Sequence, residues 1–581
     1  MKNRIRMAGF IFASLGLLAY AQTRPVDPAV PHLEKRGAAT QLIVDGRPFL
    51  VLSGEMANTA SSNSEYMKVV WPTLANRAHL NTVLTGVSWD WIEPQEGKYD
   101  FRYVDEAIEN AKRYNVRIVW IYFASWKNGI SSFAPVWVKA NQERFPRAQV
   151  RNGKTVEVLS TLSENNWQAD ARVFAALMRH VREVDTTHRC IMVQVENEVG
   201  MLGDTRDRSP LAEAAFTKPV PKELMDYLQK HKDTLLPEFR KVWEAAGFKT
   251  SGTWEEVFGK GPKADEIFMG WNYSSYINKV VEAGKKEYPI PMFVNAWIVQ
   301  PEDKGPGDYP SGGPQDHMHD IWRAGAPALD MLCPDIYLPN FTELADRYSR
   351  SGNPLYVPES AGDLRGAGNL FYAVGQRHAI GYSQFGIDGV ARSAAGAGAG
   401  PAAGANPGRG GAAQPQQVEQ LPLSEAYEML SQLAPFILEH QSSDTIASVV
   451  VNKDKPDQQF KLGNYTLNAG LPRNRRNPTA VPDTTGYGIF MATGPNEYLM
   501  AGNNLQVTFA PNSGVGFAGI ARQESGRFED GNWVHIRFLA GDDSVLRYDL
   551  GAAADAGQSA SGVRLTVGER GIQRVQVYQY K

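Results

Sequence analysis

Short apolar runs alternate with longer segments of helical periodicity from about residue 40 to residue 440. Such alternation is typical of repeated βα units that build a parallel sheet. Eight units can be counted, and eight parallel strands predict a closed (β/α)₈ barrel, the TIM barrel. The expected strands are Phe49–Glu55, Asn81–Val87, Arg117–Phe123, Ile191–Glu198, Pro291–Trp297, Leu329–Tyr337, Leu355–Ser360 and Ile380–Gly386.

A ninth apolar run, Ile267–Trp271, resembles a further strand. Its apolar positions continue at helical spacing through Tyr273, Tyr276 and Val280, so we expect a helix there.

The helical period ends near residue 440, and short runs of alternating apolar and polar residues follow it. Leu505, Val507 and Phe509 form one such run, and turn residues separate the runs, which predicts a C-terminal β-sandwich. Residues 392–417 are rich in Gly, Ala and Pro, which is typical of a flexible low-complexity segment. A helix-period segment still follows them, which favours an insertion in the barrel over an interdomain linker. The expected domains are a signal peptide at 1–21, an N-terminal extension at 22–40, the barrel at 41–440 with the insertion at 392–417, and the sandwich at 441–581.

The N-terminus has the order of a secretory signal. Basic residues precede an apolar stretch from Met7 to Leu18, and Ala19-Tyr20-Ala21 forms a small-x-small cleavage site. The stretch is shorter than the ~20 residues that a membrane-spanning helix needs. We therefore expect cleavage after Ala21, a periplasmic or secreted protein, and no membrane association after cleavage.

Composition narrows the class of partner. The chain has 581 residues, 43% of them hydrophobic and 21% charged, and a formal net charge of -3 without long runs of one sign. This balance predicts folded domains and gives no electrostatic footprint for nucleic acid. A neutral, polar substrate is consistent with this composition and net charge.

Two groups of residues raise the question of crosslinks or metals. Cys190 and Cys333 each lie in an apolar, strand-like run, so we expect two small buried side chains, although a disulfide in an oxidising compartment stays open. Residues 316–320 (DHMHD) hold two histidines and two carboxylates, which suggests either a metal site or contact with substrate at the barrel rim. We favour rim contact, and expect no metal.

Two glutamates stand where a barrel enzyme carries its catalytic groups. Catalytic residues of TIM barrels lie at the C-terminal ends of strands, and Glu198 and Glu359 end the fourth and seventh expected strands. Glycoside hydrolysis needs two carboxyl groups, one protonated and one ionised, on either side of the scissile bond. A separation near ~5 Å would permit a covalent intermediate and retention of configuration. The other reading of each glutamate is a buried ion pair with arginine.

Three segments carry a resemblance to a known family. They are QVENEVG at 194–200, NTVLTGVSWDWIEPQEGKYDF at 81–101 and YVPES at 356–360. Over about residues 40–390 the chain resembles glycoside hydrolase family 35, the β-galactosidases of retaining clan A. The resemblance implies that Glu198 is the acid/base, Glu359 the nucleophile and Asn197 a ligand of the sugar 2-hydroxyl. Glu196 would then be structural, because neighbouring strand side chains point to opposite faces.

Further residues are candidates for substrate binding. The first strand leads into SGEMANTASS, similar to the family's opening loop, which suggests Glu55 and Asn58 as hydroxyl-binding groups. Trp126, Trp297 and Tyr337 follow or end the third, fifth and sixth strands. Aromatic rings suit the C–H faces of a sugar, although each of these could equally belong to the core.

Two positions depart from the family pattern. Gly86 stands where many members have tyrosine, and Ser125 replaces a carboxylate that contacts galactose. We therefore expect sugar recognition to be rebuilt in this chain. It looks closer to a bacterial branch associated with galactose side chains of xyloglucan.

The expected function is that of a retaining, exo-acting β-galactosidase that needs no cofactor and acts on β-galactoside-containing oligosaccharides or polysaccharides. One alternative is another retaining clan A glycosidase, such as a β-glucosidase, β-glucosaminidase or endo-glycanase. The other is a barrel protein that binds carbohydrate without turnover. The sequence indicates no oligomeric state.

Overall fold

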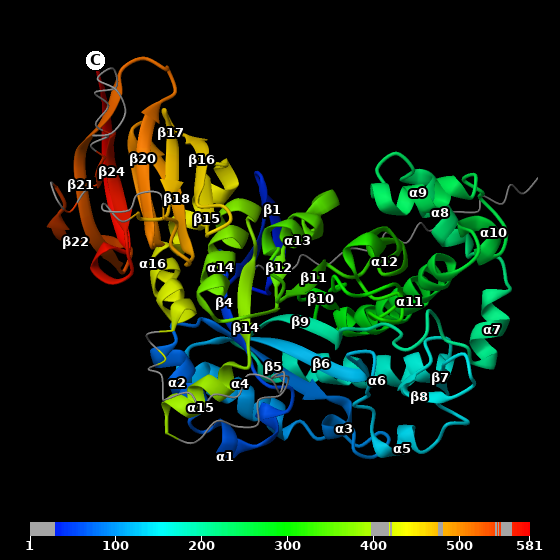
Figure 1. The fold of residues 1–581 in the computed structure, drawn as a ribbon. Coiled ribbons are helices and arrows are strands. Elements are labelled where there is room, and N and C mark those ends of the chain that lie inside the picture. The colour runs from blue at the N-terminus through cyan, green and yellow to red at the C-terminus, as the bar shows by residue number, and fades with distance from the viewer. Residues whose placement is uncertain are drawn as a thin grey trace, which may run out of the picture.

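The computed structural model describes residues 29–396, 418, 421–473, 480–540, 543, 545–547 and 560–581. A parallel barrel and a β-sandwich make up this part of the chain (Figure 1). The expected signal peptide lies outside the described residues, and so do residues 397–417 of the expected insertion. Among the described helices, none combines the length and apolar character that a membrane span requires.

The barrel contains all eight strands expected from the sequence. The seventh is broken at Pro358, which has no N–H for the strand ladder. Its first half pairs with the eighth strand and its second half with the sixth, and this closes the barrel. The strands are β4 (Val51–Glu55), β5 (Thr82–Ser88), β6 (Arg117–Lys127), β9 (Cys190–Asn197), β10 (Met292–Trp297), β11 (Met331–Ile336), β12 (Tyr356–Val357) with β13 (Glu359–Ser360), and β14 (Gly381–Phe385).

Helices surround these strands. The run at Ile267–Trp271 lies in a helix, as expected. The larger barrel helices are α2 (Val70–Arg77), α4 (Arg102–Tyr114), α6 (Glu164–Val184), α11 (Pro262–Glu287), α12 (His319–Gly325), α13 (Phe341–Tyr348), α14 (Leu364–Arg377), α15 (Ile387–Ala394) and α16 (Pro422–Ser443). Four more follow β9, on the side away from the sandwich in Figure 1: α7 (Pro210–Phe216), α8 (Lys222–Lys230), α9 (Pro237–Ala245) and α10 (Trp254–Phe258). Short helices are α1 (Ser64–Met67), α3 (Trp89–Ile92) and α5 (Val136–Lys139), and a hairpin joins β7 (Arg147–Gln149) to β8 (Thr155–Leu159).

An antiparallel sheet of β1 (His32–Arg36), β2 (Ala39–Val44) and β3 (Arg47–Phe49) precedes the barrel and spans the boundary expected at residue 40. Leu42 and Val44 of β2 pack with apolar side chains of the barrel strands, including both cysteine-bearing strands. Cys190 and Cys333 are buried and unpaired, so the expectation of two small core residues is confirmed.

The C-terminal domain is the expected sandwich. One sheet orders as β15-β18-β19-β25-β21-β22 and the other as β16-β17-β20-β24-β23, and a second apolar core lies between them. The strands are β15 (Ile446–Val451), β16 (Asp457–Leu462), β17 (Tyr465–Gly470), β18 (Gly486–Gly494), β19 (Glu497–Asn503), β20 (Leu505–Pro511), β21 (Phe517–Glu529), β22 (Asn532–Phe538), β23 (Val545–Arg547), β24 (Ala560–Leu565) and β25 (Ile572–Tyr580).

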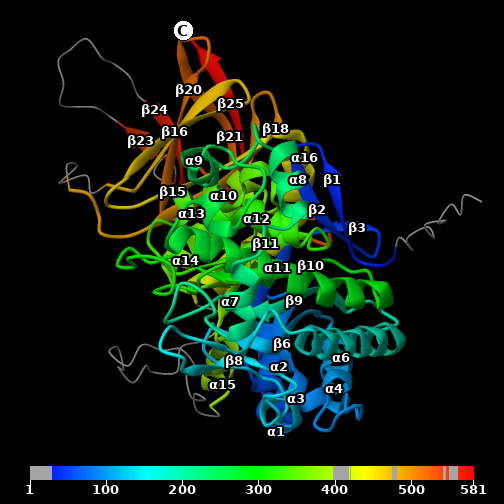
Figure 2. The ribbon, with the colours of Figure 1, turned by 90° about the vertical axis from the view of Figure 1, so that its right-hand side faces the viewer.

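Two helices connect the domains. In Figures 1 and 2, α14 and α16 lie between the sandwich and the barrel strands. The Phe371 ring of α14 lies 4.7 Å from that of Tyr487 in β18, and Phe436 of α16 lies 4.6 Å from Phe528 in β21. The sandwich is therefore fixed against the barrel through side chains of the apolar core.

Candidate active site

Glu198 and Glu359 both lie at the C-terminal edge of the barrel sheet. Glu198 directly follows β9, Glu359 opens β13, and the two residues are 8% and 7% exposed. Burial raises the pKa of Glu198 to about 7, and the neighbouring charge of Glu359 adds to the rise. Burial also raises the pKa of Glu359, whereas Lys127 and a hydrogen bond from Tyr337 oppose that rise. The charge of Glu359 therefore favours the protonated form of Glu198.

The backbone around Glu198 is strained. Glu196 and Glu198 have φ angles of 64° and 45°, in the left-handed region that non-glycine residues rarely adopt. Such conformations cost on the order of 1–3 kcal/mol each and persist where surrounding contacts hold them. Here the Asn295 side-chain oxygen accepts from the Glu198 N–H at 2.9 Å, which fixes the residue that follows the strand.

Glu196 holds two neighbouring strands together. Its carboxylate accepts from the backbone N–H groups of Ala124, Ser125 and Trp126 at 2.8–3.1 Å. These contacts use the side chain within the protein, as expected of a structural residue.

Two more carboxyl groups complete what we call the carboxyl cluster: Glu55, Glu198, Asp335 and Glu359. Glu55 ends β4 and is fully buried, and among the described residues neither of its side-chain oxygens has a hydrogen-bond partner. Asp335 lies beside Glu359 in the register of β11 and β13 and accepts from Asn295 Nδ2 at 2.7 Å. Burial first, and then the charge of Glu359, raises the pKa of both Glu55 and Asp335 well above the usual range. The charge of Glu198 adds to the rise in the pKa of Asp335.

Lys127, the last residue of β6, supplies positive charge to this cluster. Its ammonium lowers the pKa values of Glu55, Glu198 and Glu359. It also lies 3.2 Å from the Asn197 side chain, in the amide orientation where the oxygen accepts from it. Lys127, Asp335 and Asn295 were not among the residues expected from the sequence, although each lies in the C-terminal half of a barrel strand.

Replacing Lys127 tests this electrostatic role. Lys127→Met should raise the pKa of Glu359, because the opposing cation is lost, so the acid limb of a kcat/KM profile should move to higher pH by about one unit. Lys98→Met serves as a control, because Lys98 is exposed and bonds Gln95. A profile that coincides with that of the wild type would contradict the assignment.

Other expected binding residues fall around the cluster. The Tyr337 hydroxyl donates to Glu359 Oε2 at 3.0 Å, and the residue is 47% exposed. Trp297 ends β10 and is partly exposed. Asn58 follows β4, and its buried side-chain oxygen has no hydrogen-bond partner within the part of the chain that the structure describes. Glu55 and Asn58 thus offer unpaired polar atoms, and Tyr337 offers an accessible ring.

Trp126 was expected as a possible sugar platform, and the structure contradicts this. The residue is fully buried, its Nε1 donates to the Leu159 carbonyl at 3.1 Å, and its ring packs against Tyr273 and Tyr276. No face of the indole is left for a ligand. Trp126 is a core residue.

The two departures from the family pattern have structural reasons. A Cβ at Gly86 would lie 2.3 Å from the Asn58 carbonyl oxygen and 2.7 Å from the Phe123 ring, so no side chain fits there. Ser125 is buried, and its hydroxyl donates to Asp170 at 2.6 Å. Gly86 has no side chain and the Ser125 hydroxyl is bonded to Asp170, so neither position supplies the phenol or carboxylate of the family pattern.

Residues 316–320 are used within the protein. Asp316 accepts from Arg347 and Arg350 at 2.7 and 3.0 Å, and His317 lies 3.0 Å from Glu266. His319 is fully buried, and burial lowers its pKa well below the usual range. Among the described residues no group of three or more His, Cys, Asp or Glu side chains is arranged to hold a metal.

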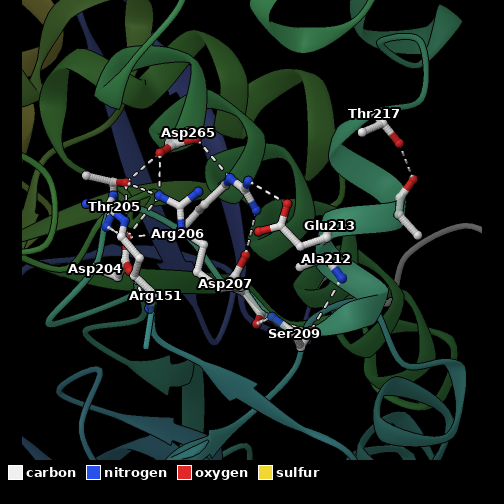
Figure 3. Close-up of polar contacts among 12 residues, drawn as sticks. Arg151, Asp204, Thr205, Arg206, Asp207, Ser209, Ala212, Glu213, Thr217 and Asp265 are labelled. Atoms are coloured by element: carbon white, nitrogen blue, oxygen red, sulfur yellow. Dashed lines mark hydrogen bonds and ion pairs between the residues drawn. The ribbon is translucent and has the colours of Figure 1, made fainter. Parts of the chain in front are cut away.

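A network of ion pairs shapes the loop that leaves Glu198 (Figure 3). Arg206 and Arg208 both bind Asp265 of α11, at 2.9 and 2.8 Å, and Arg208 also binds Asp204 at 3.0 Å. Arg206 reaches Glu213 of α7 at 2.9 Å. Because these arginines and Asp204 are largely buried, the network holds the loop in one conformation.

Part of the barrel matches the model of a known protein family. Residues 72–263, which include Glu198, match the model of glycoside hydrolase family 42, described as beta-galactosidase. This part of the barrel is similar to beta-galactosidases. The matched model is not that of family 35, to which the three motifs point. Residues 423–550, mostly in the sandwich, match a domain of unknown function, DUF5597.

Individual relatives agree with the family match. The chain is 27% identical to a beta-galactosidase of Xanthomonas manihotis over 35% of this chain and 34% of the relative. It is 25% identical to Beta-galactosidase 14 of Arabidopsis thaliana over 25% of this chain and 17% of the relative. The chain therefore aligns with about a third of the length of the first relative and about a sixth of the second. A solved beta-galactosidase from Bacillus circulans sp. alkalophilus superposes with a TM-score of 0.45 and 15% identity, over 67% of this chain and 57% of that one.

Proposed function

We propose that the protein is a retaining, exo-acting β-galactosidase of clan A that releases terminal β-galactose. The observation that carries the proposal is the pair of buried glutamates at the ends of the fourth and seventh strands, with different surroundings. The match of residues 72–263 to a beta-galactosidase model supports galactose as the sugar that is released. The finer assignments, to family 35 and to galactose side chains of xyloglucan, rest on the sequence motifs and remain part of the proposal.

In the first step Glu198 acts as the acid. A carboxyl group whose pKa is about 7 remains largely protonated in a mildly acidic medium, so it can donate a proton to the glycosidic oxygen. Glu359, whose carboxylate accepts from Tyr337, attacks C1 from the opposite side as the bond to the leaving group breaks. The product is a galactosyl ester of Glu359 and a free aglycone.

In the second step Glu198 acts as the base. Esterification removes the charge of Glu359, which is one cause of the raised pKa of Glu198, so the pKa of Glu198 should fall. Glu198 then takes a proton from water, and the oxygen of that water attacks C1 and releases galactose. Two inversions at C1 give net retention.

Glu55, Asn58, Asn197, Trp297 and Tyr337 are the proposed sugar contacts. Glu55 and Asn58 fit this role because a buried polar atom without a partner is costly unless a ligand satisfies it. Export to the periplasm or the medium, proposed from the N-terminal pattern, would bring the enzyme to its polysaccharide.

The pH dependence follows from these roles. Catalysis needs Glu198 protonated, so kcat/KM should fall as pH rises through about 7. It needs Glu359 ionised, so kcat/KM should also fall on the acid side, at a higher pH than for an ordinary carboxyl group because that pKa is raised. A kcat/KM profile measured from pH 4 to 9 on a nitrophenyl β-galactoside would show a bell, and a rate that stayed constant from pH 6 to 9 would contradict the assignment of Glu198.

The function itself is tested with a panel of nitrophenyl β-glycosides and galactosylated xyloglucan oligosaccharides. Release of galactose, lost in Glu359→Ala, is the expected result. Release of glucose or glucosamine instead, or cleavage within a chain, would favour another clan A glycosidase. Binding without turnover of any substrate would favour the carbohydrate-binding alternative.

A further inference from the structure

A cavity lies beside Tyr337, whose hydroxyl contacts Glu359 of the carboxyl cluster. It has a volume of about 300 Å³ and lies between the barrel rim and the sandwich. The barrel wall comes from the segment after β11 and from the start of α14, and the sandwich wall comes from β15, β16 and the loop between them. Its size is at the lower end of the range for small-molecule sites, ~300–1,000 Å³.

Two of its lining residues are linked to the nucleophile, one by a hydrogen bond and one by the chain. Tyr337 lines the cavity and its hydroxyl donates to Glu359 at 3.0 Å, so one side chain contacts both the cavity and the nucleophile. Ala361 also lines the cavity and follows Glu359 by two residues. The cavity is therefore the immediate neighbour of the site where the bond is broken.

The sandwich wall offers uncommitted polar groups. Lys455 lines the cavity, and within the described part of the chain its ammonium forms no ion pair or hydrogen bond. Gln458 donates its amide N–H to the Val450 carbonyl, which leaves its side-chain oxygen available. The loop that carries Lys455 is fixed, because the Asn452 side chain accepts from the N–H groups of Asp454 and Lys455 at 3.0 and 2.9 Å.

The charges of the barrel wall are already paired. Asp346 accepts from Tyr372 at 2.6 Å and binds Arg377, and Asp363 binds Arg365 at 3.2 Å. Together, a barrel wall with paired charges and tyrosine rings and a sandwich wall with a free ammonium donor and a free amide oxygen suit a neutral molecule rich in hydroxyl groups.

The two walls are held at a fixed distance. A Cβ at Gly375 of α14 would lie 2.6 Å from the Ser448 Cβ of β15, and one at Gly368 would lie 3.1 Å from Val450. Glycine thus allows the strand to lie directly on the helix. The sandwich therefore presents Lys455 and Gln458 in a rigid position, which lowers the entropic cost of binding.

We propose that this cavity binds a further, neutral sugar unit of the glycan whose terminal galactose is cleaved, with Lys455 and Gln458 of the sandwich as its ligands. This inference rests on the proposed β-galactosidase function. It gives the sandwich a role in substrate selection, and it makes the enzyme distinguish a galactosylated oligosaccharide from an isolated galactoside.

The test compares two substrates in a variant carrying both Lys455→Ala and Gln458→Ala. The kcat/KM for a galactosylated xyloglucan oligosaccharide should fall about tenfold, mainly through KM, while kcat/KM for 4-nitrophenyl β-galactoside stays within about twofold. Lys453→Ala is the matched control, because Lys453 lies in the same loop, pairs with Asp483 and does not line the cavity. An unchanged thermal midpoint would show that the double variant is folded.

The remaining outcomes separate a failure of this inference from a failure of the proposed function. Equal effects of the double variant on both substrates, or no effect on either, would overturn the inference and leave the β-galactosidase assignment standing. The same holds if the wild type cleaves the nitrophenyl galactoside but none of a series of galactosylated oligosaccharides. If the wild type releases galactose from no substrate, the proposed function fails and the inference fails with it.

Discussion

Glu359→Gln should lower kcat on 4-nitrophenyl β-galactoside by about 10⁴-fold or more, which corresponds to at least ~5.5 kcal/mol of lost transition-state stabilisation. The amide cannot form the covalent galactosyl intermediate, so the two-step route is closed. The fold should be retained, because replacing a buried carboxylate with an amide of the same shape removes a charge that is costly to bury. Initial rates measured by nitrophenol release, together with thermal unfolding, check both statements.

A matched control separates this effect from a general change in charge. Glu343 lies on α13 close to the rim, its side chain is 61% exposed, and its partner is Arg347. Glu343→Gln should keep kcat within about twofold of the wild type, because exposed ion pairs contribute little. If the two variants lost activity equally, Glu359 would not be the nucleophile.

Glu198→Gln should show a different signature, because the missing acid matters only where the leaving group needs a proton. General acid catalysis contributes roughly 10²–10⁴-fold, so kcat/KM for an oligosaccharide should fall by about that factor. A dinitrophenyl galactoside, whose leaving group needs little assistance, should lose far less in kcat/KM. Rates on both substrates measure this contrast.

Chemical rescue adds a second readout for Glu198. In Glu198→Ala, azide should enter the space of the missing side chain and attack the galactosyl intermediate, which restores turnover of the dinitrophenyl substrate and yields β-galactosyl azide. An equal loss on both substrates without rescue by azide would contradict the acid/base role.

The sequence predicted the barrel because its strands are buried on both faces and therefore appear as continuous apolar runs. The break at Pro358, through which the seventh strand closes the barrel, was not predicted. Proline explains the missing ladder bond, but the pairing of the two halves with different neighbours depends on tertiary contacts.

The carboxyl cluster was only partly predictable. Glu55, Glu198 and Glu359 stand at strand ends and could be found from the sequence, whereas Lys127 was missed because the third strand was expected to end at Phe123. The register with β9 shifts between Tyr122 and Lys127, and this irregularity carries the strand four residues further.

The same irregularity explains the error at Trp126. Its side chain turns away from the barrel mouth and packs against Tyr273 and Tyr276 of α11, where it bonds to Leu159 of β8. Asp335 was passed over because Tyr337, two residues later, was taken as the residue that ends the sixth strand. Alternation along the strand places side chains two residues apart on one face, which could have indicated Asp335.

Trapping of the covalent intermediate tests the central claim most directly. A fluorine at C2 destabilises the oxocarbenium-like transition states of both steps, and a dinitrophenolate leaving group allows the first step to proceed, so the galactosyl ester accumulates. The wild type would be incubated with 2,4-dinitrophenyl 2-deoxy-2-fluoro-β-galactoside and examined by intact-mass and peptide mass spectrometry. We predict one fluorogalactosyl group per chain, attached to Glu359 and absent in Glu359→Gln. An adduct on another residue, or turnover of galactosides with no adduct at all, would contradict the account.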